Sequence, residues 1–230
     1  MIETSKLKLY LVTDPHLCAS FGLLNTVNAA IKGGITMVQL RDKEASTKER
    51  VEIGRALKKI LKDSQIPLII NDDIEAAVAI DADGIHVGQS DENPIAIRSK
   101  IGREKIVGLS CETIKDARDA DPALVDYIGI SPVFPTKTKS DFNAYIGLDG
   151  ISDIVNATSI PSVAIGGLKK EHCGEIFIRG CKGMAVVSAI CGKEDPCKET
   201  ELLNAEMHRI LNYNKTVSYT HLTLPTTVDV

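Results

Sequence analysis

The feature that most constrains the fold is a series of eight short apolar runs, separated by longer amphipathic segments. Each run is rich in Ile, Val and Leu with little polar alternation, which is typical of parallel strands buried on both faces. The expected strands are Leu7–Thr13, Met37–Arg41, Pro67–Asn71, Gly84–Val87, Lys105–Ser110, Tyr127–Ile130, Pro161–Ile165 and Gly183–Val187.

The segments between these runs have helical patterns. Thr47–Lys62 carries apolar residues at helical spacing behind Ser46 and Thr47, which are both N-cap candidates. Gly33–Gly34 and Gly180 stand where helices should stop. The other expected helices are Asp73–Ile80, Pro94–Ile101, Ile114–Ala120, Leu148–Val155, Lys170–Arg179 and Lys198–Leu211.

Alternation of strands and helices predicts a parallel sheet with right-handed crossovers, and eight such units favour a closed (β/α)8 TIM barrel over an open doubly wound sheet. We place this single domain at residues 1–216 of the 230-residue chain. Residues 217–230 include the Thr-rich stretch Ser218–Val230, which resembles a read-through scar. We expect this tail to be non-helical, disordered and of non-native origin.

Composition excludes several classes of function. The net charge of −4 argues against a nucleic-acid-binding face, which would be strongly basic. No stretch approaches the roughly 20 apolar residues of a membrane span, and the N-terminus does not resemble a signal peptide. The six cysteines form no CxxC pair, so we interpret them as buried free thiols of a cytoplasmic protein. The sequence is compatible with a homo-oligomer.

Polar residues follow most of the expected strands, where active sites of such barrels lie. Gln39, Arg41 and Lys43 alternate, so their side chains should share one side and could grip a polyphosphate. The alternative interpretation of these three residues is a solvated strand end.

Asp72 and Asp91 follow adjacent strands and suit Mg²⁺, which takes one or two carboxylates plus water and phosphate oxygens. The alternative for Asp72 is a helix cap, a role that we assign to Asp73.

Two further loops are candidates for anion binding. Pro135–Lys139 combines two hydroxyl groups with two lysines, which indicates an anion site or a closing lid, although a surface loop would look similar. Gly166–Gly167 and Val187–Ser188 follow the seventh and eighth strands, the usual phosphate position, although glycines of a tight turn would also fit. His86 should point into the barrel, where a packed core histidine is the favoured interpretation.

Together, the segments VQLRDK, NDD, DGIHVGQSD, GLS, SPVFPTKTKSD, AIGG and VVSAI resemble thiamine phosphate synthases, in that order across about residues 7–191. The resemblance implies a cytoplasmic, Mg²⁺-dependent transferase that condenses two small molecules, an aminopyrimidine methyl diphosphate and a thiazole phosphate. It implies three sites: one for the pyrimidine diphosphate, which includes the catalytic residues, one for the metal and one for the thiazole phosphate. The first site would comprise Gln39, Arg41, Lys43, Asn71, Ser110 and Lys139, with Arg41, Lys43, Lys139 and Ser110 catalytic. The metal would bind Asp72 and Asp91, and the thiazole phosphate Thr136, Lys137, Thr138, Gly167, Val187 and Ser188.

The chain departs from the family pattern at Ser131, where glycine is common, and at Asn143-Ala144-Tyr145, which adds bulk to the expected lid. Two other functions compete. A thiazole tautomerase would not need the diphosphate-gripping cations, and a non-catalytic phosphate sensor could dispense with the metal pair. The presence of Arg41, Lys43 and both acidic residues argues against each.

Overall fold

The computed structural model describes residues 2–136 and 144–220. Its strands are β1 (Leu9–Val12), β2 (Met37–Leu40), β3 (Leu68–Asn71), β4 (Gly84–Val87), β5 (Ile106–Cys111), β6 (Tyr127–Ile130), β7 (Ser162–Ile165) and β8 (Gly183–Val186). Its helices are α1 (Leu23–Gly33), α2 (Thr47–Leu61), α3 (Ile74–Ala79), α4 (Pro94–Ile101), α5 (Ile114–Asp119), α6 (Gly147–Asn156), α7 (Cys173–Ile178) and α8 (Pro196–Thr220). Short 3-10 turns, η1 (Thr4–Leu7) and η2 (Lys170–His172), precede β1 and α7.

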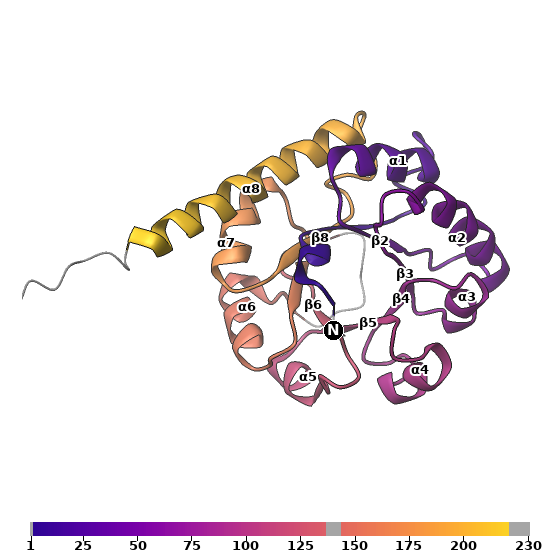
Figure 1. Cartoon of the computed structure of the whole chain (residues 1–230), viewed down its shortest axis with the longest axis horizontal. Helices are drawn as coiled ribbons and strands as arrows, with labels where there is room; N and C mark the ends of the chain where they lie inside the picture. Colours follow the sequence, from indigo (N-terminus) through magenta and orange to yellow (C-terminus); the bar gives the residue numbers. More distant parts are fainter. Residues whose placement is uncertain (1, 137–143, 221–230) are drawn as a thin grey trace, which may run out of the picture.

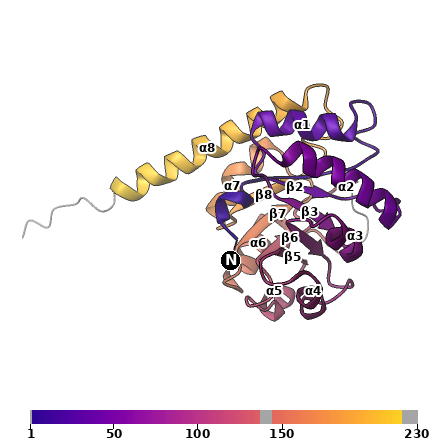
Figure 2. The same cartoon turned by 45° about the vertical axis from the view of Figure 1, so that its right-hand side comes forward.

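The strands close into a parallel barrel in sequence order, with β8 pairing back onto β1. The helices form a ring around the strands (Figure 1) and enclose them when the molecule is turned (Figure 2). The predicted (β/α)8 TIM barrel is therefore confirmed. Because all strands run the same way, their carboxyl ends meet at one mouth of the barrel.

Alternation along each strand separates two buried regions. Tyr10 and Val12 face the interior of the barrel and pack with Met37, Ile69 and Tyr127, whereas Leu9 and Leu11 pack outward beneath the helices. Paired strands set large interior side chains beside small residues: Tyr10 pairs with Ala185, Ile69 with Gly84, and Tyr127 with Gly108. This size pairing lets a narrow barrel enclose two complete tyrosine side chains.

Local capping positions the helices behind the strands. Ser46 caps α2 through a capping box with Glu49, which confirms Ser46 as one of the two predicted N-cap candidates. Asn93 caps α4 ahead of Pro94. At the other end of a helix, Gly34 takes the left-handed conformation (φ 95°) that closes α1.

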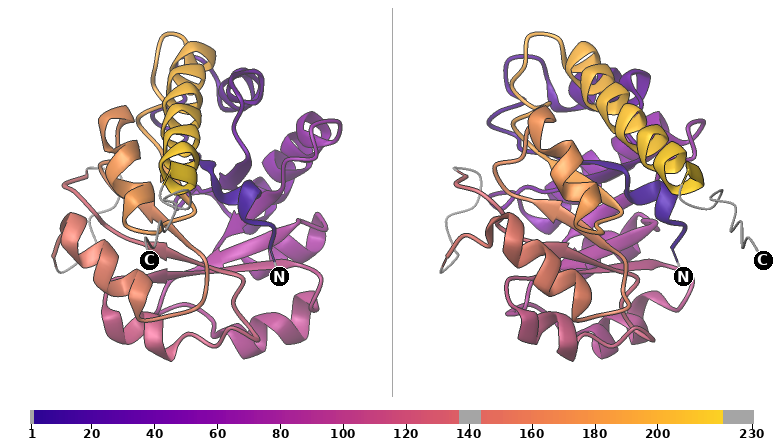
Figure 3. Two further views of the ribbon diagram at one scale, coloured as in Figure 1. Left: turned by 60° about the vertical axis from the view of Figure 1, so that its left-hand side comes forward. Right: turned by 90° about the vertical axis from the view of Figure 1, so that its left-hand side faces the viewer.

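Several predicted boundaries differ from those of the structure, and α8 (Pro196–Thr220) is longer at both ends than the predicted helix Lys198–Leu211. The first strand begins at Leu9, because Leu7 belongs to η1, and the predicted helix Lys170–Arg179 divides into η2 and α7. The prediction that Ser218–Val230 is non-helical is wrong for residues 218–220, which continue α8. Residues 221–230 lie outside the described residues. Figure 3 shows α8 running along the outside of the barrel beside α7, with which it packs.

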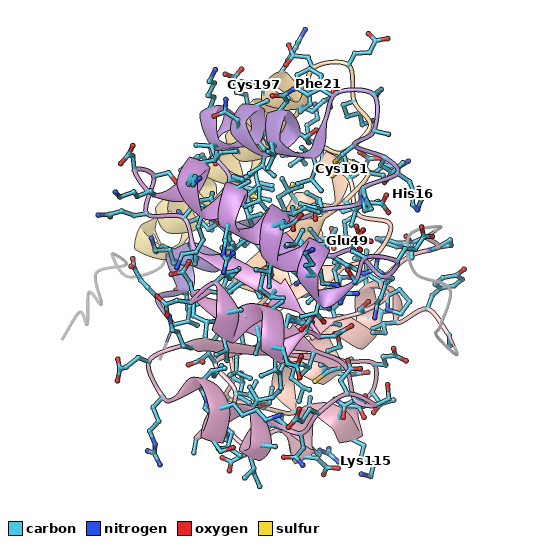
Figure 4. All side chains as sticks on the ribbon, turned by 90° about the vertical axis from the view of Figure 1, so that its right-hand side faces the viewer. His16, Phe21, Glu49, Lys115, Cys191 and Cys197 are labelled. Carbon is cyan, nitrogen blue, oxygen red and sulfur yellow. The ribbon has the colours of Figure 1, made fainter. Side chains whose placement is uncertain are left out.

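The cysteines follow the prediction of buried thiols with one exception. All six are free, and Cys197 alone is half-buried rather than buried. Figure 4 shows Cys197 near the outer edge of the molecule and Cys191 further in. Across the described ranges, no helix is both long and apolar enough to cross a membrane.

Candidate active site

A cavity of about 450 Å³ opens at the carboxyl ends of the strands. Its apolar lining includes Val12, Val163 and Ile165, and polar groups surround the opening, as is common in small-molecule sites. Most of the site residues predicted from the sequence line this cavity: Gln39, Arg41, Lys43, Asn71, Asp72, Asp91, Ser110, Thr136 and Val187.

Two other predicted residues are described but do not line the cavity. Gly166 lines the cavity in place of Gly167, and Ser188 is exposed outside it. Gly167 has a φ of 64° and packs so closely under the loop after β6 that an added Cβ would lie 2.6 Å from the Pro135 carbonyl oxygen. Lys137, Thr138 and Lys139 are outside the described residues, as is Asn143.

Two carboxylates and a lysine meet at one side of the cavity. Lys43 Nζ lies 2.5 Å from Asp72 Oδ2, and Asn71 Nδ2 donates to the other Asp72 oxygen at 2.7 Å. Burial raises the pKa of Asp72, Lys43 lowers it, and the charge and side-chain contact of Asp91 raise it again. Asp72 and Asp91 are therefore direct neighbours that repel one another.

The backbone holds both carboxylates in place. Asp72 has a φ of 62°, in the left-handed region that Asp and Asn tolerate better than most residues, and its N–H donates to the His86 carbonyl oxygen at 2.9 Å. Asp91 Oδ2 accepts the Gly88 N–H at 2.7 Å, and an added Cβ at Gly88 would lie 3.1 Å from that same oxygen. The loops after β3 and β4 thus aim their acidic residues at a shared point.

The adjacent residue Asp73 has a different role. Its side chain accepts the Ala76 N–H at 2.9 Å and caps α3, and its second oxygen pairs with Arg50 at 2.8 Å. The assignment of the cap to Asp73 is confirmed, and the Asp72 carboxylate is left to face the cavity.

The acidic pair fits a hard divalent cation. In the described ranges no cluster of three or more His, Cys, Asp or Glu residues could hold a metal. Two neighbouring carboxylates are nevertheless the protein share that Mg²⁺ typically takes, with water and phosphate oxygens completing the octahedron. A cation between Asp72 and Asp91 would also relieve their repulsion. His16 does not line the cavity; it lies out on the β1–α1 loop (Figure 4), beside Glu44.

Arg41 supplies a positive charge on the same side of the barrel. Its backbone N–H donates to Thr13 Oγ1 at 3.0 Å, which anchors the strand end. No carboxylate of residues 2–136 or 144–220 is within ion-pair distance of its guanidinium group. The side chain is therefore available to a bound anion, for which its planar fork is suited.

Sequence reasoning missed part of the cavity wall. His86 does point inward as predicted, yet it lines the cavity, with Nε2 3.0 Å from Ser110 Oγ and Nδ1 3.0 Å from the Tyr127 hydroxyl. Tyr10 also lines it, and the alternation of β1 could have indicated this because Tyr10 and Val12 share the inner face. Glu112, Thr113 and Asp116 follow β5, so a search continued beyond Ser110 would have included them.

Comparison with known proteins gives a consistent group of relatives. A family model described as thiamine monophosphate synthase matches residues 9–190. The thiamine-phosphate synthase of Vibrio campbellii is 43% identical over 196 residues, covering 85% of this chain and 96% of the relative. That of Xanthobacter autotrophicus is 46% identical over 199 residues, with coverages of 86% and 94%. The solved structure of a thiamine phosphate pyrophosphorylase from Pyrococcus furiosus matches with a TM-score of 0.82 at 36% identity, covering 90% of this chain and 98% of that one.

Proposed function

The chain belongs to the thiamine monophosphate synthase family, and on this premise we propose the reaction that it catalyses. It joins 4-amino-2-methyl-5-pyrimidinylmethyl diphosphate to 4-methyl-5-(2-phosphoethyl)thiazole, with Mg²⁺, and releases diphosphate. The chain is a transferase of thiamine biosynthesis by its family. The proposal concerns the two substrates, the metal and the residues that bind them.

The observation that carries the proposal is the meeting of Asp72, Asp91 and Lys43 at one side of the cavity. Arg41 lines the same cavity and adds a cation. Acidic residues beside cations suit a metal–diphosphate complex, since the metal binds the carboxylates and the cations bind the remaining phosphate oxygens. A ligand carrying only one phosphate monoester would not require both groups.

Charge stabilisation dominates the proposed chemistry. The methylene–oxygen bond breaks with both electrons going to diphosphate, and the thiazole nitrogen supplies the lone pair for the new carbon–nitrogen bond. Arg41 and Lys43 would hold the diphosphate as its negative charge grows. Mg²⁺, when bound by Asp72 and Asp91, would neutralise further charge on the leaving group. The attacking nitrogen carries no proton, so the reaction needs no general base.

The remaining cavity residues would bind the rings and the second phosphate. Gln39 and Ser110 belong to the polar part of the lining and would contact the aminopyrimidine, and Asn71 would steady the diphosphate end. The thiazole phosphate would lie toward Thr136 and Val187, which line the cavity. By the family pattern it would also contact Gly167 and Ser188, which directly follow the cavity-lining Gly166 and Val187 in the chain. By the family pattern, Lys137 and Thr138 would bind the thiazole phosphate and Lys139 the diphosphate; all three lie outside the described residues.

The direct test is an assay of the purified protein with both substrates and Mg²⁺. We expect thiamine phosphate and diphosphate to form in equal amounts, and neither to form when one substrate is omitted. Conversion of the thiazole phosphate alone to an isomer, without diphosphate release, would instead indicate a tautomerase. Binding of thiazole phosphate without any turnover would indicate a sensor and overturn the proposal.

A further inference from the structure

A chain of hydrogen bonds crosses the interior of the barrel below the cavity. Gln39 Nε2 donates to the Tyr10 hydroxyl at 2.7 Å, and the Tyr10 and Tyr127 hydroxyls are 2.9 Å apart. The Tyr127 hydroxyl lies 3.0 Å from His86 Nδ1, and His86 Nε2 lies 3.0 Å from Ser110 Oγ. We call this series the buried relay; its members are Gln39, Tyr10, Tyr127, His86 and Ser110.

Both ends of the buried relay reach the cavity, but its centre does not. Gln39, His86 and Ser110 line the cavity, whereas Tyr127 is absent from the lining and fully buried. Tyr127 packs edge-on against Tyr10, with ring centroids 5.9 Å apart, and lies 5.5 Å from the His86 ring. Tyr127 can therefore affect a bound ligand only through its neighbours.

Two glycines make room for the central rings. An added Cβ at Gly108 would lie 2.3 Å from Tyr127 Cζ and 2.5 Å from His86 Nδ1, and one at Gly129 would lie 3.1 Å from His86 Cε1. Any side chain at Gly108 would thus displace the atoms that form the Tyr127–His86 hydrogen bond. The geometry of the relay depends on the backbone of β5 as well as on its own side chains.

The donor at Gln39 sets a direction along the relay. Burial raises the pKa values of Tyr10 and Tyr127 well above their ordinary value, so each phenol keeps its proton. Gln39 donates to the Tyr10 hydroxyl. In the arrangement where each later member also donates onward, Tyr10 gives its hydrogen to Tyr127 and Tyr127 gives its hydrogen to His86 Nδ1. His86 then carries its proton on Nε2 and donates to Ser110. The Ser110 hydroxyl hydrogen is then left for another acceptor, and Ser110 lines the cavity.

From this geometry we infer that Tyr127 is a positioning residue: through His86 it fixes Ser110 as a hydrogen-bond donor to a ring nitrogen of the bound pyrimidine. The identity of the ring rests on the proposed function, whereas the direction of the relay does not. Reversal of the relay would have the opposite effect. Ser110 would donate to His86 Nε2 and offer only lone pairs to a ring nitrogen, which is itself an acceptor.

The direction is tested by ¹⁵N NMR of histidine-labelled protein without substrates. The chain has five histidines, and the signal missing from His86→Asn identifies His86. We expect His86 to be protonated at Nε2 and unprotonated at Nδ1, and Tyr127→Phe to abolish this preference. Protonation at Nδ1 in the unaltered protein, or an unchanged tautomer in Tyr127→Phe, would overturn the inference.

Gln39→Glu provides a second variant of nearly the same shape. Its carboxylate can only accept from Tyr10, so the relay should reverse and His86 should become protonated at Nδ1. This reversal is expected even if Tyr127→Phe fails to fold. A His86 tautomer that stays at Nε2 in Gln39→Glu would show that Gln39 does not set the direction.

Kinetics then link the relay to the reaction. Tyr127→Phe should lower kcat/KM for the pyrimidine diphosphate by about tenfold, the effect of one lost hydrogen bond, and leave the KM for thiazole phosphate unchanged. Equal losses for both substrates would indicate a general structural defect and contradict a positioning role. If the unaltered protein makes no thiamine phosphate, the proposed function fails, but the NMR result still decides the direction of the relay.

Discussion

Lys43 and Asp72 form an ion pair at the edge of the cavity, with the ammonium nitrogen 2.5 Å from the carboxylate oxygen. The same carboxylate faces Asp91, and after burial the interaction with Lys43 is the main influence on its pKa. Lys43 therefore partly neutralises an acidic pair that we expect to receive Mg²⁺. Once the metal binds there, the Lys43 ammonium group would be free to turn to a phosphate oxygen.

Removal of the metal or of its ligand should stop the reaction. Chelation of Mg²⁺ should abolish turnover, and Asp72→Asn should lower kcat on the order of a hundredfold or more, because the charge on the leaving diphosphate is then less well stabilised. Asn suits the test better than Ala, since Asn also tolerates the left-handed backbone at φ 62°. Steady-state rates across a Mg²⁺ titration provide the measurement.

Asp119→Asn is a matched control for the metal variant. Asp119 pairs with Lys115 on the exposed surface of α5, where Figure 4 shows Lys115 at the outer edge of the molecule. This control should keep both its rate and its Mg²⁺ dependence. Undiminished turnover of Asp72→Asn, or of the unaltered protein under chelation, would remove the metal assignment.

Arg41 should affect the two substrates unequally. Arg41→Ala removes a cation that has no ion-pair partner in the described part of the chain, so fold stability should change little. The KM for the pyrimidine diphosphate should rise about tenfold or more, because a charge-assisted contact is lost, and binding of thiazole phosphate should change less. Initial rates with each substrate varied in turn measure this difference. An equal loss for both would contradict the division of the cavity.

The strand pattern predicted the barrel well because parallel strands buried on both faces are nearly continuous apolar runs. Gly84–Val87 and Tyr127–Ile130 match the observed strands β4 and β6. No helix was predicted over the residues of α1, because the local sequence gives little sign of one. Helix α1 begins behind Gly22, which offers no side-chain cap, and it includes Asn25, Thr26 and Asn28, which are weak helix formers. Packing against α8 offsets these preferences.

The candidate site could be predicted from the sequence only in part, because some of its contacts join strands that are far apart in the chain. Strand ends could be inferred from the sequence, so Arg41, Asp72 and Asp91 were expected at one mouth of the barrel. The contact of Tyr10 with Tyr127 joins residues 117 positions apart across the interior. No spacing rule within one strand contains that information, because it depends on barrel closure and on the glycine at position 108.

Gly108→Ala should destabilise the protein and disturb the buried relay. The new Cβ would lie 2.3 Å from Tyr127 Cζ, and overpacking of this kind typically costs about 1–3 kcal/mol. Gly174→Ala in α7 is the matched control, since its Cβ would make an ordinary 3.6 Å contact with Ile210. Urea unfolding measures both. Equal stabilities of the two variants would mean that the interior around Tyr127 has room that the structure does not show.

Substitution of Asp73 should lower the stability of the fold, whereas substitution of its neighbour Asp72 should lower kcat. Asp73→Ala removes the cap of α3 and the ion pair with Arg50, and the lost cap should lower the free energy of unfolding by about 1–2 kcal/mol. Asp73→Asn keeps a capping oxygen for the Ala76 N–H and should lose less. Both Asp73 variants should retain kcat, because Asp73 does not line the cavity, whereas Asp72→Asn should lose kcat and retain most of its stability. Urea unfolding and steady-state rates on the three variants separate the two roles. A loss of kcat in Asp73→Asn as large as that in Asp72→Asn would show that the adjacent carboxylates act as one unit and would refute the division between them.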